Sequence, residues 1–323
     1  MLRRWLVFLL VAETIAYVAI ATVLFTRGWG GWATLALIFL VALVWHGSHA
    51  CSSFLVCAAL RWRDGRHDRR AWSALWGEFT VRLTSFNISQ PFEQWVMPDE
   101  PAVMATQDPG VGAGVPMLLV HGYFSNRGMW VQFRQHMLAS MAEKKVDIGS
   151  IYSVTLETPF DSIDVLAEQL HDRIEFICAS TGHNQVVLVC HSMGGLVARA
   201  YRIKYGAARL ARLITLGTPH HGTQIASLGV GTSSKQMGWH SPWLTALAAT
   251  EQGTMGPNTP PTTSIYTVND DLVYPPESSC LVWADNIAVD GVGHIGLLFS
   301  DKVVKLVVQA IKTNVQHPRG VQD

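Results

Sequence analysis

The ten residues VVLVCHSMGG (186–195) decide the fold of this chain. Their first half is a continuous apolar run, typical of a strand that is buried on both faces of a parallel sheet. Ser192 follows directly, and a Gly pair then opens a helix-periodic stretch that reaches Tyr205. This order predicts a strand, a sharp turn that exposes Ser192, and a helix, which is the context of the G-x-S-x-G nucleophile elbow. Cys190 stands in place of the first Gly of that motif, and its side chain is still small.

Short apolar runs alternate with helix-periodic stretches on both sides of this segment. Strands are expected at 117–121, 150–156, 186–190, 213–216, 264–268 and 280–284, and helices at 128–142, 162–179, 193–205 and 301–311. Strands that alternate with helices form a mostly parallel sheet with helices on both faces. We therefore predict an α/β domain over residues 116–316.

A serine becomes a nucleophile when an imidazole takes its proton and a carboxylate orients that imidazole. After a nucleophile elbow, the acid comes before the histidine in the chain. Asp270 and Asp271 both follow the strand expected at 264–268, and the D-x-x-V-x-P spacing favours Asp270. His294 lies in a Gly-flanked loop before the last helix. We predict that Ser192, Asp270 and His294 are catalytic, with Asp271 as the alternative acid.

Attack on a carbonyl carbon creates an oxyanion that needs two backbone N–H donors. One donor belongs to the residue after the nucleophile, Met193, and the other to the loop after an earlier strand. The segment His121-Gly122-Tyr123 ends an apolar strand, so we assign the second donor to Tyr123, with Phe124 as the alternative. His121 is expected to order this loop rather than to act as a base.

Five motifs together resemble bacterial lipases and esterases of the α/β-hydrolase superfamily. They are His121-Gly122, CHSMGG at 190–195, GTPHHGT at 217–223, the Asp270 segment and the Gly-flanked His294. The similarity covers roughly Val115 to Ser300, and the chain departs from the pattern at Cys190 and in its amino-terminal region. The resemblance implies the α/β-hydrolase fold and a serine esterase that works through an acyl-enzyme.

The resemblance also implies which residues line the substrate pocket, namely Phe124, His191, His220 and His221. Residues 224–261 are rich in Met and aromatic side chains and are the candidate for a cap, although core packing would give the same composition. A metal site is not expected, because adjacent histidines point in opposite directions in an extended chain and no carboxylate has a matching spacing. No cofactor is predicted.

The expected substrate is a lipophilic ester. One triad serves many acyl transfers, so thioesterase, amidase and polyester depolymerase activities are the enzymatic alternatives, and an inactive, membrane-tethered binding module is the non-enzymatic one. The intact Ser–Asp–His set argues against the inactive module. Basic and acidic residues number 24 each, so nothing indicates a nucleic-acid partner. No obligate protein partner is inferred.

The apolar excess of the chain lies at its amino terminus. Two apolar runs, Trp5–Phe25 and Trp32–Leu60, are separated by a Gly-rich turn, and each is long enough to cross a hydrocarbon core of about 30 Å. A cleaved signal peptide is the alternative for the first run, but that run is long and is followed by a second without a convincing cleavage site. We predict a transmembrane helical hairpin over residues 1–62.

Positive charges predict the orientation of this hairpin. Arg3 and Arg4 precede the first run, Arg27 lies in the turn, and five arginines follow between residues 61 and 70. Basic flanks stay on the cytoplasmic side. We therefore expect a multi-pass protein of the inner (cytoplasmic) membrane with its catalytic domain in the cytoplasm. The five cysteines show no metal-binding spacing and are expected to be reduced.

Residues 63–115 connect the predicted hairpin to the predicted domain. Their apolar side chains recur at helical spacing: Trp72, Leu75, Trp76, Phe79 and Leu83. Such a stripe is compatible with a helix at the membrane interface or with one that packs on the neighbouring domain. The Pro- and Gly-rich stretch 98–116 is typical of a linker.

Three ionisable residues lie inside the predicted membrane spans, Glu13 in the first and His46 and His49 in the second. Such groups are unfavourable in a bilayer core and usually face a partner. At about 1.5 Å per residue, Glu13 and His49 lie at depths of ~12 and ~16 Å from the same side, with His46 one turn deeper. We therefore expect Glu13 to pair with one of these histidines, the alternatives being a protonated Glu13 or a Glu13 that snorkels in a dimer.

Overall fold

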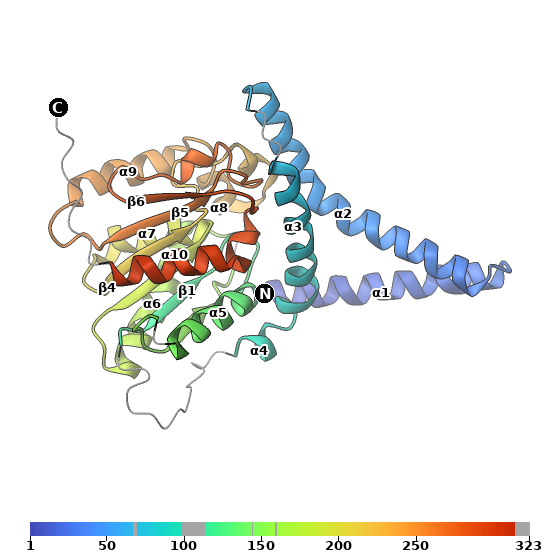
Figure 1. The fold of residues 1–323 in the computed structure, drawn as a ribbon, viewed down its shortest axis with the longest axis horizontal. Helices are drawn as coiled ribbons and strands as arrows, with labels where there is room; N and C mark the ends of the chain where they lie inside the picture. Colours follow the sequence, from blue (N-terminus) through green and yellow to red (C-terminus); the bar gives the residue numbers. More distant parts are fainter. Residues whose placement is uncertain (67–69, 99–113, 144, 159, 314–323) are drawn as a thin grey trace.

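The computed structural model describes residues 1–66, 70–98, 114–143, 145–158 and 160–313. A sheet flanked by helices forms the larger part of the molecule, and two long helices, α1 (Leu2–Thr26) and α2 (Gly31–Arg63), project from it as a hairpin (Figure 1). Helix α3 (Arg70–Thr84) runs along the side of the sheet part, at the base of this hairpin (Figure 1).

The sheet has six strands in the order β2-β1-β3-β4-β5-β6, and every neighbouring pair is parallel. The strands are β1 (Met117–Val120), β2 (Ile151–Val154), β3 (Val186–His191), β4 (Leu210–Leu216), β5 (Thr262–Thr267) and β6 (Asp285–Val289). The predicted parallel α/β architecture is confirmed.

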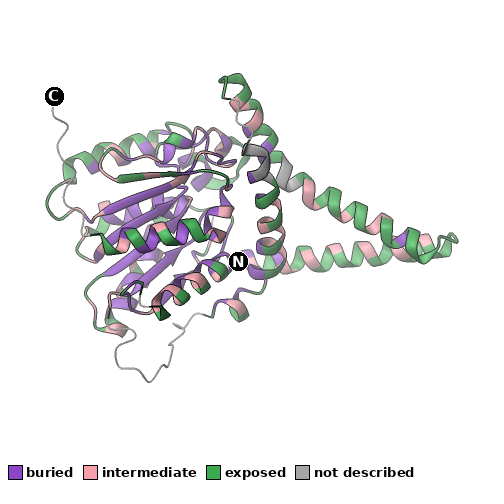
Figure 2. Ribbon diagram, in the orientation of Figure 1, coloured by how far each residue is buried: buried purple, intermediate pink, exposed green. Residues whose placement is uncertain are grey.

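Two layers of helices cover the sheet. Because side chains alternate along a strand, Leu118 and Val120 of β1 enter one core cluster and Met117 and Leu119 enter the other. The first cluster includes residues of α6 (Ile163–Thr181) and α7 (Met193–Tyr205), and the second includes residues of α5 (Val131–Ala142) and α10 (Asp301–Lys312). Figure 2 shows the strands buried between helices whose outer faces are exposed.

One predicted strand was misplaced. The apolar stretch 280–284 forms a turn, and the last strand is β6, five residues later. The side chain of Asn286 holds this turn by bonding the backbone N–H and the C=O of Leu281, at 2.9 and 2.8 Å. Because β6 lies at the edge of the sheet, it keeps polar, exposed residues that hide its strand character.

Short helices complete the chain. They are η1 (Ser85–Ser89), α4 (Glu93–Val96), η2 (Arg127–Trp130), η3 (Gln224–Leu228), α8 (Gly231–Gln236), α9 (Pro242–Thr254), η4 (Pro276–Ser279) and η5 (Ile295–Phe299). The proposed cap segment therefore contains η3, α8 and α9. Helix α9 is fixed to the core, because buried Glu251 pairs with Arg199 at 2.5 Å and with Arg202 at 3.0 Å.

Helices α1 and α2 contain the two described segments that are long and apolar enough to cross a membrane, Leu2–Thr26 and Gly31–Ser48, with mean hydropathies of 2.3 and 1.6. In the most apolar 18-residue stretch of each segment, only 6% is buried inside the protein. At 1.5 Å per residue, α1 is about 37 Å long, enough for a hydrocarbon core of about 30 Å.

Glu13 and His46 pair across the hairpin. The Oε1 atom of Glu13 lies 3.0 Å from Nε2 of His46, and the hydroxyl of Tyr17 also donates a hydrogen bond to Glu13. The expected pairing of Glu13 with one of the two histidines is confirmed for His46. The side chain of His49 lies outside the described residues.

Helix α3 packs on the sheet part through one face, where Ala74, Glu78 and Ser85 just after the helix are buried. Its opposite side leaves Trp76 70% exposed. Of the predicted stripe, Phe79 and Leu83 are half-buried and Trp76 is exposed. The face that packs on the domain is therefore the one with Ala74 and Glu78 rather than the whole stripe. The side chains of Trp72 and Leu75 lie outside the described residues. The described cysteines, Cys57, Cys178, Cys190 and Cys280, are free thiols.

Candidate active site

Ser192 sits on a sharp turn between β3 and α7. Its backbone has φ 55° and ψ −125°, a conformation that is unfavourable for a residue with a side chain, by of order 1–3 kcal/mol. The turn is held because the N–H of Ser192 donates to the carbonyl of Leu216 at 2.9 Å. Close neighbours must be glycine: a Cβ atom on Gly122 would lie 2.7 Å from Cβ of Ser192, and one on Gly194 would lie 2.6 Å from the carbonyl oxygen of Val120.

His294 and Asp270 form a buried pair. Nδ1 of His294 lies 2.8 Å from Oδ2 of Asp270. The other oxygen, Oδ1, accepts the backbone N–H groups of Leu272 at 2.9 Å and Val273 at 2.7 Å, which fixes the carboxylate. A carboxylate at Nδ1 keeps the proton on that nitrogen and leaves Nε2 as the basic one.

The carboxylates around His294 determine its protonation. Burial alone would lower its pKa, but the charge of Asp270 and its hydrogen bond to the ring outweigh burial, and Asp271 and Glu78 act in the same direction. The pKa of His294 is therefore raised above its ordinary value.

Asp271, the alternative acid, has other partners. Its Oδ2 atom lies 2.5 Å from Nη2 of Arg82 and accepts the hydroxyl of Ser53 at 2.9 Å. Its Oδ1 atom reaches only the backbone N–H of His294, at 3.5 Å. The structure thus brings Asp270, and not Asp271, to the imidazole ring.

Helix α3 positions the His294 loop through Glu78. Both carboxylate oxygens of this buried residue accept backbone N–H groups, from Ile295 and Gly296, each at 2.9 Å. Gly293 leaves room for this contact, since a Cβ atom there would lie 2.3 Å from Oε2 of Glu78. Burial and the charge of Asp271 raise the pKa of Glu78, and Arg82 opposes them. Glu78 is not among the residues predicted from the sequence, although a Glu and an Arg four residues apart beside an apolar stripe were a signal for it.

Helix α2 positions the Asp270 loop. Nη2 of Arg61 donates to the carbonyl oxygens of Val268 at 2.7 Å and of Asp270 at 3.1 Å. The thiol of Cys57 lies 3.2 Å from the same Asp270 carbonyl. From the sequence, Arg61 counted only as one of the charges that predict the membrane orientation, and no local pattern indicated this contact.

The residues predicted to hold an oxyanion lie next to Ser192. Met193 is the first residue of α7, so its N–H has no acceptor inside the helix. Tyr123 and Phe124 follow β1 and line the same cavity as Ser192. The Tyr123 hydroxyl is fixed by the backbone of Val230, from whose N–H it accepts and to whose carbonyl it donates, both at 2.8 Å.

His121 orders this loop, as expected. Its Nε2 atom accepts the N–H of Leu156 at 2.9 Å, and Nδ1 lies 2.8 Å from the carbonyl oxygen of Gly122. Burial lowers the pKa of His121 to about 4, so the ring is neutral at physiological pH.

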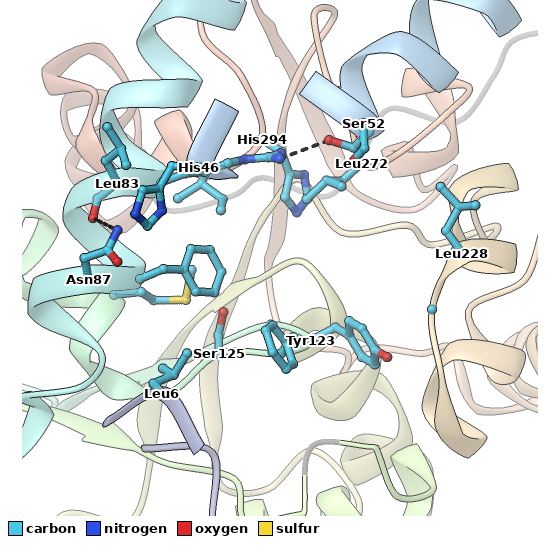
Figure 3. Close-up of a pocket in the computed structure, with 18 of the residues that line it drawn as sticks. Leu6, His46, Ser52, Leu83, Asn87, Tyr123, Ser125, Leu228, Leu272 and His294 are labelled. Carbon is cyan, nitrogen blue, oxygen red and sulfur yellow. Dashed lines mark hydrogen bonds between the residues drawn. The ribbon is translucent and has the colours of Figure 1, made fainter. Parts of the chain in front are cut away.

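A cavity of about 920 Å³ adjoins Ser192 and His294. Phe124 and His191, two predicted pocket residues, line it, as do Leu228 and Met237 from the proposed cap segment. The His191 ring lies 4.6 Å from that of His294, and its Nε2 atom is 3.1 Å from the His294 carbonyl oxygen. Figure 3 shows that side chains from several elements surround this space, among them Leu6 of α1, His46 of α2 and Leu83 of α3.

His220 and His221 lie elsewhere. Nε2 of buried His220 is 3.1 Å from the Thr215 hydroxyl, and Nε2 of His221 is 3.0 Å from the carbonyl oxygen of Cys280. Both border a separate, smaller hollow of about 340 Å³. Neither ring lines the cavity at Ser192, so the structure corrects their assignment to the substrate pocket. The described residues contain no group of three or more His, Cys, Asp or Glu arranged to hold a metal ion.

Comparison with known proteins agrees with this architecture. Residues 117–294 match the profile of the Alpha/beta hydrolase family. The solved structure of Aspergillus fumigatus lipase B is similar, with a TM-score of 0.55, 19% identity, and coverage of 65% of this chain and 55% of the lipase. Bacillus licheniformis lipase BlEst2 in its propeptide form gives a TM-score of 0.52, 18% identity, and coverage of 67% and 53%. The chain thus spans about half the length of these lipases, and similarity at this level concerns the fold. From the match over 117–294, this chain belongs to the alpha/beta hydrolase family.

Proposed function

We propose that this protein is a membrane-anchored serine hydrolase that cleaves carboxylic esters of lipophilic substrates. The observation that carries this proposal is the buried His294–Asp270 pair, in which Nδ1 lies 2.8 Å from Oδ2. His294 lines the same cavity as Ser192, which sits on a strained turn. The similar lipase structures are consistent with it.

The proposed reaction uses each residue in one role. Nε2 of His294 takes the proton of Ser192 Oγ while Oγ attacks the ester carbonyl carbon, and Asp270 stabilises the imidazolium that forms. The N–H groups of Met193 and Tyr123, with Phe124 as the alternative to Tyr123, hold the oxyanion. His294 then protonates the departing alcohol, and the carbonyl–oxygen bond breaks to leave an acyl-enzyme. A water deprotonated by His294 releases the carboxylic acid and restores Ser192.

The cavity supports a lipophilic substrate. Its volume of about 920 Å³ lies at the upper end of the range for small-molecule sites, roughly 300–1,000 Å³. Most of its wall is aliphatic or aromatic, including Phe79, Phe86, Leu228 and Ile225. A substrate with a long apolar part would bury that part here.

An activity-based probe tests the proposal. We expect a fluorophosphonate to label the purified full-length protein once per chain, with the adduct on the peptide that contains Ser192. Ester, thioester and amide analogues with the same acyl group then rank the reaction classes, and the ester is expected to be the best substrate. A protein that resists the probe and hydrolyses none of the three would contradict the proposed function.

The raised pKa of His294 predicts the pH dependence of this activity. The imidazole must be neutral to accept the serine proton, so activity is lost as pH falls through the pKa of the free enzyme. Because the nearby carboxylates raise this pKa, we expect the acid limb of kcat/KM to have its midpoint above the ordinary value of about 6.5. In Glu78→Gln, which removes one of these charges, the midpoint should move to lower pH. A midpoint well below 6 in the wild type would contradict the charge arrangement.

We further propose that α1 and α2 cross the cytoplasmic membrane as a hairpin, with the catalytic domain in the cytoplasm. Both ends of the hairpin contact the catalytic domain, which supports their lying on the same side of the membrane. The amino group of Met1 lies 2.6 Å from Glu157, and Arg66, just after α2, pairs with Glu277 at 2.8 Å. The arginines that follow α2 favour the cytoplasmic side.

A topology reporter checks this orientation. Alkaline phosphatase fused after Asp323 is expected to be inactive in cells, and green fluorescent protein at the same site is expected to fluoresce, because both would lie in the cytoplasm. The control is the same pair of reporters inserted at Gly30, in the turn between the helices, where the result should be reversed. An active phosphatase after Asp323 would overturn the proposed orientation.

A further inference from the structure

The cavity at Ser192 is not built by the catalytic domain alone. Both helices of the amino-terminal hairpin contribute to its wall, α1 through residues from Leu6 to Ile20 and α2 through Val41, Trp45 and His46. These contacts join the space in front of the nucleophile to the space between two helices that are long and apolar enough to cross a membrane.

The residues of α1 that line the cavity form a continuous stripe along one face of the helix. Its members recur at intervals of three or four residues and include Leu6, Leu9, Ala12, Glu13, Ala16 and Ile20. From Leu6 to Ile20 the stripe is about 21 Å long. One leaflet contributes half of a hydrocarbon core of about 30 Å. The stripe therefore reaches as deep into the membrane as the acyl chains of one leaflet.

The cavity extends between the two helices, where Ile20 of α1 and Val41 and Trp45 of α2 line it. The two helices meet at the turn near Gly30 and separate toward the domain, so that α1, α2 and α3 outline a wedge (Figure 1). The outward faces of α1 and α2 are exposed (Figure 2) and carry apolar side chains, such as Phe8, Val18 and Phe39, that are more than 60% exposed. In a bilayer these faces contact lipid, so the space between α1 and α2 lies at the depth of the hydrocarbon region.

Glu13 interrupts the apolar stripe, but it already has partners. It accepts from Tyr17 and pairs with His46 at 3.0 Å, so its carboxylate is part of the wall that ties α1 to α2. The groups on either side of it along the stripe, Leu9, Ala12 and Ala16, are aliphatic. An alkyl chain fits such a path better than a polar headgroup does.

We propose that the ester reaches Ser192 sideways from the membrane: a long acyl chain of a bilayer lipid passes between α1 and α2 and lies along the α1 stripe during the reaction. This inference rests on the proposed function and adds to it the substrate class, a membrane-resident lipid ester. A lateral path keeps the acyl chain in apolar surroundings throughout, whereas a route through water would expose every methylene group. The carbonyl carbon stops at Ser192, and the rest of the chain stays in the wedge.

Bulky substitutions in the stripe test this path. Ala12→Trp and Ala16→Trp each place an indole in the cavity, and Val18→Trp is the matched control, because Val18 lies about 200° around α1 from Ala16 and does not line the cavity. The full-length protein is reconstituted into phosphatidylcholine vesicles. The substrates are p-nitrophenyl palmitate and p-nitrophenyl butyrate, which differ only in acyl length.

The readout is the ratio of kcat/KM for palmitate to that for butyrate, which does not depend on the fraction of active protein. We expect this ratio to fall at least tenfold in Ala12→Trp and Ala16→Trp and to stay within twofold of wild type in Val18→Trp. An unchanged ratio in both alanine variants, or an equal fall in Val18→Trp, would overturn the lateral path. Those outcomes leave butyrate hydrolysis intact, whereas failure of the proposed function would abolish turnover of both esters and labelling by a fluorophosphonate.

Discussion

Ser192→Ala is expected to lower kcat for ester hydrolysis by about 10⁴- to 10⁶-fold, the loss that follows removal of the nucleophile from a catalytic triad. Without Oγ no acyl-enzyme forms, and only the oxyanion donors and the binding cavity remain to assist attack by water. The measurement is the hydrolysis of p-nitrophenyl butyrate by the purified full-length protein, corrected for the spontaneous rate.

The same variant should remain folded. Alanine can occupy the turn at φ 55° at a backbone strain similar to that of serine, since both carry a Cβ atom. We therefore expect the melting temperature to change little, whereas fluorophosphonate labelling disappears. Ser180→Ala, at the end of α6 and remote from the cavity, is the matched control and should react normally. Near-normal turnover by Ser192→Ala would remove this residue from the mechanism.

Asp270→Asn is expected to reduce kcat by about 10³- to 10⁴-fold. The amide can keep the contacts of Oδ1 with the N–H groups of Leu272 and Val273, so the loop retains its shape. Its NH₂ group then faces Nδ1 of His294 and requires that nitrogen to accept a hydrogen bond. The proton moves to Nε2, which can no longer take the proton of Ser192.

Asp271→Asn is the matched comparison, and we expect it to lower the free energy of unfolding rather than kcat. This variant removes the negative charge from the 2.5 Å contact with Arg82 but leaves the His294–Asp270 pair intact. Weakening one hydrogen bond to a buried charged group removes on the order of 1–3 kcal/mol from the free energy of unfolding. We expect kcat to stay within about tenfold of wild type, which is 1.4 kcal/mol of barrier. If Asp271→Asn lost more activity than Asp270→Asn, the assignment of the acid would be wrong.

Local patterns were sufficient to predict most of the architecture. The apolar run at 186–190 and the periodicity of α6 and α10 each report on burial within one element, so the alternation of strands and helices could be read directly. The edge strand β6 was misplaced because its exposed polar residues carry no such signal. The apolar turn before it was a more strand-like sequence, although Val282 in that turn is 99% exposed.

Contacts between distant parts of the chain could not be predicted in this way. Glu78 and Ile295 are 217 residues apart, and Arg61 and Val268 are 207 apart, so no spacing rule connects them. Chain order and turn chemistry placed Ser192, Asp270 and His294 near one sheet edge. They did not give the direction of His220 and His221, because that direction depends on the geometry of a single turn.

The contacts of Arg61 and Glu78 have a consequence for how such a protein can be changed. An amino-terminal segment can be exchanged or deleted when it makes no contacts with the domain that follows it. Here α2 donates to the loop that carries Asp270, and α3 accepts from the loop that carries His294. Deleting these helices would remove the hydrogen bonds that support both loops, so the amino-terminal helices and the α/β domain must be engineered as one unit.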